Sequence, residues 1–147
     1  MKIPFLKNRL KLPTDLEILE CIYTEYYEDF ASYTKNSRAA KVYVPVDFDR
    51  IGRKLGVDGD IPFGRLYYFL NSKFQIELSS GNVTQLFETS VGGDANKSKN
   101  AVQFVLLASV LSEMKIEHKK HITNITILWM SLVISLAALF ISLFKGV

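Results

Sequence analysis

The sequence predicts a mainly α-helical domain with a small β-hairpin, followed by one C-terminal transmembrane helix. The chain has 147 residues, which leaves room for one compact domain and an anchor but not for two full domains. Apolar residues recur at helical intervals before residue 114, and no residue from Ile122 to Phe144 is charged. The predicted parts are a basic amphipathic arm (1–13), a folded domain (14–114), a basic juxtamembrane segment (115–121), a transmembrane helix (122–144) and a tail (145–147).

The N-terminal arm alternates basic and apolar residues. It lacks the continuous apolar core of a signal peptide, so we do not expect the following domain to be exported. One interpretation places the arm on anionic lipid, and the other packs Phe5 and Leu10 on the domain. The basic residues of the arm are Lys2, Lys7, Arg9 and Lys11.

The first helix begins after Pro13. Thr14 and Glu17 have the spacing of a capping box, in which each side chain satisfies a free backbone N–H. Six acidic residues make the helix strongly acidic, and we read them as a solvated face rather than a site for a basic partner. Cys21, the only cysteine, excludes an intrachain disulfide and fits a packed position. The predicted buried face is Leu19, Ile22, Tyr26, Phe30 and Tyr33.

A short strand and a second helix come next. Residues 42–46 are rich in β-formers, but Pro45 suits only an edge strand. Asp47 or Asp49 caps a helix that ends at Gly56, because glycine readily takes the left-handed conformation after a helix.

Three further elements complete the domain. A helix from Pro62 to Asn71 is predicted to bury Phe63, Leu66, Phe69 and Leu70. An alternating segment, residues 74–87, predicts a hairpin with its turn at 79–82. After a polar loop over 91–100, a helix is expected over 101–120, and it continues into the transmembrane segment because no Pro or Gly intervenes.

The order helix, short strand, helix, turn, helix, hairpin resembles a winged helix-turn-helix domain over Thr14 to Phe87. The closest segments are VDFDRIGRKLGV (46–57) and GRLYYFLNSKFQIEL (64–78). The resemblance implies that Gly52 lies where two helices cross. It also implies that the helix at 62–71 and the following hairpin form a recognition surface, which in many members of the family binds DNA.

The candidate recognition surface is mostly basic. Four aspartates lie among its cations, and residues 1–114 are neutral, with 14 Lys and Arg against 14 Asp and Glu. Because phosphate contacts supply most non-specific affinity for DNA, this balance favours a protein partner. DNA binding by a membrane-tethered regulator is the alternative. The candidate residues are Arg50, Arg53, Lys54, Arg65, Tyr68, Lys73, Lys97 and Lys99.

The transmembrane prediction rests on Ile125 to Phe144. These twenty residues make about 30 Å of helix, which matches the hydrocarbon core of a bilayer. Twelve are Leu, Ile, Val or Phe, and together they favour insertion by about 5 kcal/mol. The basic residues that precede the span, Lys115, Lys119 and Lys120, place the domain on the cytoplasmic side, at the inner membrane in a bacterium.

Four small residues of the span fall on one helical stripe. Small side chains allow two helices to approach closely in lipid, so the stripe is a candidate for self-association into a homo-oligomer. Chance spacing of common residues is the alternative. The stripe consists of Ser131, Ser135, Ala138 and Ser142.

The sequence lacks the residues of an enzyme or a metal site. Only two histidines occur, His118 and His121, and both follow the folded domain, so a His-assisted nucleophile and a zinc site are not expected. No cofactor is expected. We therefore predict a membrane-anchored, non-enzymatic interaction or regulatory module that binds membrane lipid and an unidentified protein. A small oligomerising membrane effector is a further alternative.

Overall fold

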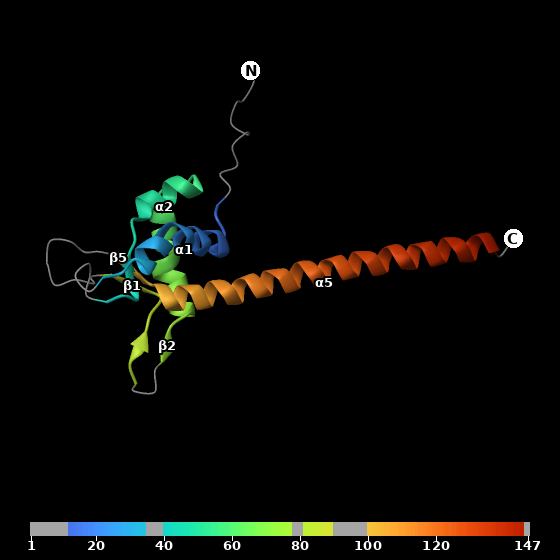
Figure 1. Ribbon diagram of the computed structural model, residues 1–147. Coiled ribbons are helices and arrows are strands. Elements are labelled where there is room, and N and C mark those ends of the chain that lie inside the picture. Colours follow the sequence, from blue (N-terminus) through green and yellow to red (C-terminus); the bar gives the residue numbers. More distant parts are fainter. Residues whose placement is uncertain (1–11, 35–39, 78–80, 90–99, 146–147) are drawn as a thin grey trace, which may run out of the picture. The chain divides into compact units, whose positions relative to one another are not determined.

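The computed structural model describes residues 12–34, 40–77, 81–89 and 100–145 (Figure 1). The chain divides into two compact units, Met1–Leu111 and Ser112–Val147. The fold is mainly helical, with small antiparallel sheets and one long apolar helix at the C-terminus, as the sequence predicts. The arm at 1–11, the hairpin turn at 78–80 and the loop at 90–99 lie outside the described residues.

The first helix, α1 (Asp15–Ala31), begins with the predicted capping box. The Glu17 N–H donates to the Thr14 hydroxyl at 3.2 Å, and the Thr14 N–H donates to the Glu17 carboxylate at 2.7 Å. These bonds satisfy two backbone donors that a helix start otherwise leaves free. The predicted face is confirmed at Leu19, Ile22 and Tyr26, which are buried together with Ile18.

Strand β1 (Tyr43–Pro45) and helix α2 (Phe48–Leu55) follow, and both match the sequence prediction. The Asp47 side chain caps α2 by accepting the Arg50 N–H at 3.1 Å. Gly56 ends the helix in the left-handed region, with φ 71°.

Gly52 lies at the close approach between α2 and the next turn. A Cβ added there would lie 2.6 Å from the Gly59 backbone nitrogen and 2.8 Å from the Val57 oxygen. Only glycine fits there without a shift of backbone, but the backbone that Gly52 meets belongs to the turn before the next helix and not to a crossing helix.

One helical segment runs from residue 60 to 73 in three parts: α3 (Asp60–Arg65), a π-helical turn η1 (Leu66–Leu70) and α4 (Asn71–Lys73). We call it the central helix. Its buried residues, Pro62, Leu66 and Leu70, are four apart. The prediction that Phe69 is buried is wrong, because its side chain is 59% exposed.

The π turn gives a physical reason for the exposure of Phe69. The Asn71 N–H donates to the Leu66 carbonyl, five residues back, so this turn is wider than an α-helical one. In this wider turn Leu70 lies on the same buried face of the helix as Leu66. Phe69 is less than a full turn from Leu66, so its side chain points toward solvent.

Two small antiparallel sheets follow the central helix. The predicted hairpin is present as β2 (Ile76–Glu77) paired with β3 (Val83–Thr84). Phe87, however, does not belong to that hairpin but begins β4 (Phe87–Thr89), which pairs with β5 (Asn100–Gln103). Strand β5 also pairs with β1, giving the order β1-β5-β4 and leaving β1 at an edge, as Pro45 predicts.

The last helix, α5 (Phe104–Lys145), begins three residues later than predicted. Ala101 and Val102 are buried within β5, which lies between the preceding strand β4 and the remote strand β1. At the junction of β5 and α5, the Phe104 N–H donates to the Val42 carbonyl at 2.7 Å. Pairing with the segment before β1 thus satisfies a backbone N–H that the start of a helix would otherwise leave free.

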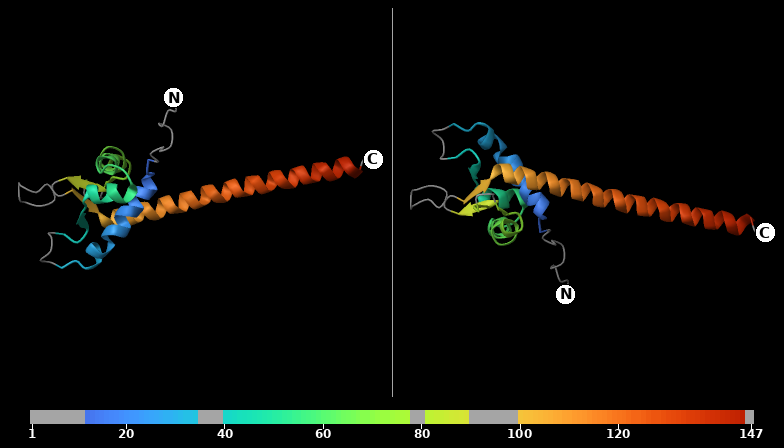
Figure 2. Two further views of the ribbon diagram at one scale, coloured as in Figure 1. Left: turned by 90° about the horizontal axis from the view of Figure 1, so that it is seen from above. Right: turned by 90° about the horizontal axis from the view of Figure 1, so that it is seen from below.

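The core of the folded unit lies between α1, the three-stranded sheet and the first turns of α5. Both views of Figure 2 show α1 beside the start of α5. The Phe104 ring stacks on Phe30 at 4.8 Å and on Tyr23 at 5.2 Å between centroids. The Tyr26 hydroxyl accepts the Asp47 N–H at 2.8 Å, which ties α1 to the start of α2.

Helix α5 continues without a break to Lys145, as predicted. It is the one helix among the described residues that is long and apolar enough to cross a membrane, by length and composition. None of its most apolar window is buried within the protein.

Candidate interaction surface

Three consecutive aromatic side chains are exposed on the central helix. Tyr67, Tyr68 and Phe69 are 44%, 68% and 59% exposed. The Phe63 ring stacks on Tyr67 at 5.7 Å between centroids and packs edge-on against Phe87 at the same distance. Tyr67 is therefore supported by Phe63 and Phe87, and Tyr68 packs edge-on against Tyr67 at 4.9 Å between centroids.

An open apolar groove lies between this aromatic cluster and the start of α1. Its volume is about 610 Å³. Leu12, Pro13 and Ile18 line one side, and Ile61 and Tyr68 line the other. Gly64 also lines the groove. A Cβ placed at Gly64 would lie 3.8 Å from the Tyr68 ring, which is an ordinary van der Waals distance.

Arg65 links the two sides of the groove. Its guanidinium donates from Nε and Nη2 to the two carboxylate oxygens of Asp15, at 2.5 and 3.0 Å. It also lies over the Phe69 ring, 4.7 Å from the centroid. The hydrogen bonds to Asp15 raise the pKa of Arg65 above its usual value. The positive charge of Arg65 is thus paired with a carboxylate of the same chain.

Glu25 of α1 binds two further cations of the candidate recognition surface. Its carboxylate pairs with both Arg50 and Lys54 of α2, and its side chain is only 8% exposed. The hydrogen bond from Lys54 and the charge of Arg50 lower the pKa of Glu25. The Arg50 guanidinium also lies over the Tyr26 ring, 5.8 Å from the centroid.

Arg53 and Lys73 are the other candidate cations among the described residues. Arg53 is exposed on α2, and the Lys73 amine lies over the Phe74 ring, 4.9 Å from the centroid. Lys97 and Lys99 lie outside the described residues. The predicted surface is therefore less available to phosphate than its composition indicates, because Arg50, Lys54 and Arg65 are each paired with an acid.

Sequence reasoning missed much of the aromatic cluster and the groove. The sequence pattern includes Tyr68 in the candidate recognition surface, omits Tyr67 and places Phe69 in the core. The signal was present in the run Tyr67-Tyr68-Phe69, because three consecutive residues of a helix cannot all face one side. At least one of these aromatics had to be exposed.

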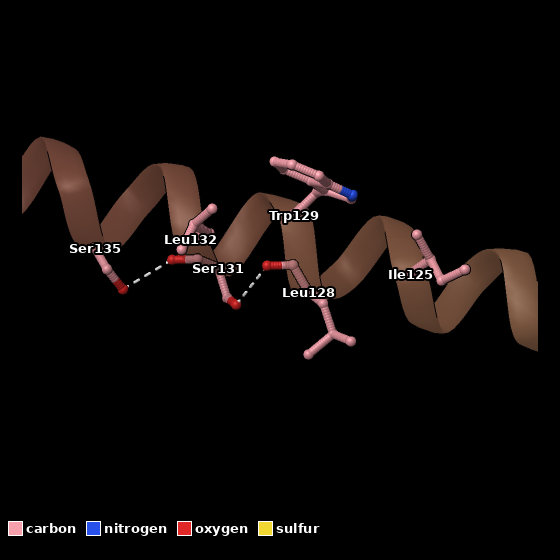
Figure 3. Close-up of a pocket in the computed structure, with 6 residues that line it drawn as sticks. All are labelled: Ile125, Leu128, Trp129, Ser131, Leu132 and Ser135. Carbon is pink, nitrogen blue, oxygen red and sulfur yellow. Dashed lines mark hydrogen bonds between the residues drawn. The ribbon is translucent and has the colours of Figure 1, made fainter.

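The predicted stripe of small residues lies on exposed positions of α5. The Ser135 hydroxyl donates to the Ser131 carbonyl at 2.8 Å, and the Ser131 hydroxyl donates to the Leu128 carbonyl at 2.9 Å (Figure 3). The hydrogen bonds of these two hydroxyls are made within their own helix, so neither side chain would bring an unpaired donor into an apolar environment. Ala138 and Ser142 follow on the same stripe. The juxtamembrane lysines, Lys115, Lys119 and Lys120, are also exposed on α5.

Among the described residues, no group of three or more His, Cys, Asp or Glu side chains could hold a metal ion. Burial raises the pKa of the Cys21 thiol, which disfavours the reactive thiolate.

The comparisons with known proteins add no family. Neither a family model, nor a curated protein, nor a solved structure matches this chain.

Proposed function

We propose that this protein is a membrane-anchored, non-enzymatic interaction module of winged-helix type, with its folded unit on the cytoplasmic side. The element order supports the winged-helix assignment: α1, β1, α2, a turn and the central helix precede antiparallel hairpins. Of the two hairpins, β4–β5 is the better candidate for the wing, since β5 pairs directly with β1 and so joins the hairpin to the helices. The wing then consists of β4 and β5 rather than the predicted hairpin with its turn at 79–82.

The exposed aromatic cluster is the observation on which the proposed protein partner rests. Aromatic residues are enriched in protein interfaces, where they supply large contact areas at low entropic cost. Tyr68 and Phe69 border an apolar groove, and Arg65 beside them is already paired with Asp15. This chemistry fits a protein segment with apolar side chains better than it fits a polyanion.

The anchoring proposal rests on the exposed apolar part of α5 together with the basic residues that precede it. Leu128, Ile134 and Phe140 are each more than 60% exposed, an unfavourable state in water. In lipid the same surface is favoured, and an unbroken helix satisfies its own backbone. The lysines before the span favour a cytoplasmic folded unit.

Site-specific photo-crosslinking in cells tests the proposed surface. A photoreactive amino acid replaces Tyr67 in the full chain, and the matched control replaces Tyr27, which is also a tyrosine and also 44% exposed. We expect a discrete protein adduct from position 67 that is absent from position 27. Equal labelling from both positions, or none from position 67, would contradict the proposal.

A tethered DNA-binding regulator is the second candidate, because the element order is that of a helix-turn-helix domain and Arg53 is exposed on it. The full chain in mild detergent is tested for mobility shift of random duplex at low salt. We expect no shift, because the paired cations leave few partners for phosphate. A shift that weakens steeply with salt would favour the regulator over the protein-binding module.

A further inference from the structure

The charged residues that precede the apolar part of α5 form two unlike faces. Lys115, His118 and Lys119 are three or four residues apart, so they share one side of the helix. We call these three residues the basic face. A helix turns about 100° per residue, which places the other charged or titratable residues of the segment on the opposite side. Those residues are Glu113, Glu117, Lys120 and His121, and all of them are exposed.

The basic face continues into the apolar segment. Ile122 follows Lys115 by seven residues and Trp129 follows it by fourteen, which is close to four helical turns. Along the axis, Trp129 lies about 15 Å beyond Lys119, roughly half the hydrocarbon thickness of a bilayer. The Trp129 side chain is 64% exposed and points away from the helix (Figure 3).

We propose that the basic face binds the anionic headgroups of the leaflet that α5 enters. The inference rests on the proposed anchoring, because the face meets headgroups only if the following residues are in the bilayer. Basic side chains near an anionic lipid surface are attracted to it, and the attraction falls off within a Debye length. A phosphate held between Lys115 and Lys119 places its acyl chains along Ile122 and Trp129.

The opposite face differs in its charge. Glu117 lies one turn from both Lys120 and His121, and Glu113 lies one turn before Glu117. These carboxylates repel lipid phosphate and reduce the positive potential around Lys120. Lipid binding is therefore predicted to be one-sided, with Lys115 and Lys119 contributing and Lys120 contributing little.

Trp129 is the only tryptophan of the chain, so its fluorescence reports the lipid beside the basic face. The full-length protein is reconstituted in vesicles that contain a fixed fraction of brominated lipid, a contact quencher. The bromine is carried by phosphatidylglycerol in one series and by phosphatidylcholine in the other. At low salt we expect the relative binding constant to favour the anionic lipid by about fivefold or more, and the preference to shrink at high salt.

Charge-removing variants show whether the preference belongs to the basic face. We expect K115Q/K119Q to bring the relative binding constant close to one. The matched control, K120Q, removes a lysine of the same segment from the opposite face and keeps the preference. Loss of the preference in K120Q to the same extent as in K115Q/K119Q would overturn the one-sided site.

The quenching experiment also separates this inference from the anchoring on which it rests. If neither brominated lipid quenches Trp129, α5 is not in the bilayer and the anchoring itself is refuted. If both lipids quench equally in the unmodified chain, the anchoring stands and the anionic-lipid site is refuted.

Discussion

The two ends of helix α5 have similar apolar side chains in opposite environments. Leu107 is fully buried and Leu111 is 5% exposed, whereas Leu128 is 67% exposed and Leu136 is 53% exposed. The first pair packs in the folded unit, which ends at Leu111. Burial of a leucine is worth about 1.5–3 kcal/mol, and Leu128 and Leu136 do not gain this stabilisation from contacts within the chain. One continuous helix therefore belongs to a protein core at its start and, by our proposal, to lipid further on.

Substitution of leucine at each end of α5 gives the largest expected contrast. We expect Leu107→Ala to destabilise the folded unit by about 2–5 kcal/mol, because it leaves a cavity in a packed core. Leu136→Ala removes the same atoms from an exposed position and leaves the stability of the folded unit unchanged. Hydrogen exchange of full-length protein in detergent measures both variants. Equal protection of the folded unit in the two variants would contradict the division of α5.

A glycine pair tests how closely the core of the folded unit is packed. Gly52→Ala places a methyl group against backbone atoms of Val57 and Gly59, and we expect a loss of about 1–3 kcal/mol. Gly64→Ala places the same group within a helix at ordinary van der Waals distance from Tyr68 and is expected to be neutral or stabilising by up to about 1 kcal/mol. Thermal unfolding of the two variants in the same detergent gives the comparison. A Gly52→Ala protein as stable as Gly64→Ala would show that the close approach at α2 can relax.

Glu25 of α1, which pairs with two cations of α2, is expected to have a smaller and pH-dependent effect on stability. Because the pKa of Glu25 is lowered in the folded state, its stabilisation is present above its unfolded pKa of about 4.3 and is lost as pH falls through the folded value. We expect Glu25→Gln to lower the unfolding temperature at pH 7, with the difference closing as the pH falls below about 4. A difference that stays constant or widens in acid would assign the effect to packing instead of charge.

The smallest expected effect on stability is at the exposed aromatic cluster. Tyr68→Ala removes a side chain that is mostly in solvent, so the change in unfolding free energy is expected to stay within about 0.5 kcal/mol. The same substitution is expected to abolish the protein adduct formed from position 67. Retention of that adduct at full strength would place the partner on another surface.

Sequence signals that act over a few residues predicted their elements well. The capping box at Thr14, the edge strand at Pro45 and the stop at Gly56 each depend on the chemistry of one turn. The long apolar helix was equally clear, because a run without charge over residues 122–144 needs no knowledge of tertiary structure.

Features that depend on distant partners were not predictable from the sequence. Residues 101–103 have a helix-compatible pattern, but β1 and β4 lie on either side of them in the folded unit and impose a strand. The pairing of Arg65 with Asp15 joins residues 50 positions apart, and that of Arg50 with Glu25 joins two helices. These pairings, which reduce the charge of the candidate surface, appear only once α1 is packed in place.

Integration of α5 into a membrane is tested by the partition of the full-length protein in a cell lysate. Membranes are collected by ultracentrifugation and washed with alkaline carbonate, which strips peripheral proteins. Integration of α5 predicts that the protein stays in the washed membrane and is released only by detergent. Recovery of the unaggregated protein in the detergent-free supernatant would contradict the anchoring and the roles proposed from it.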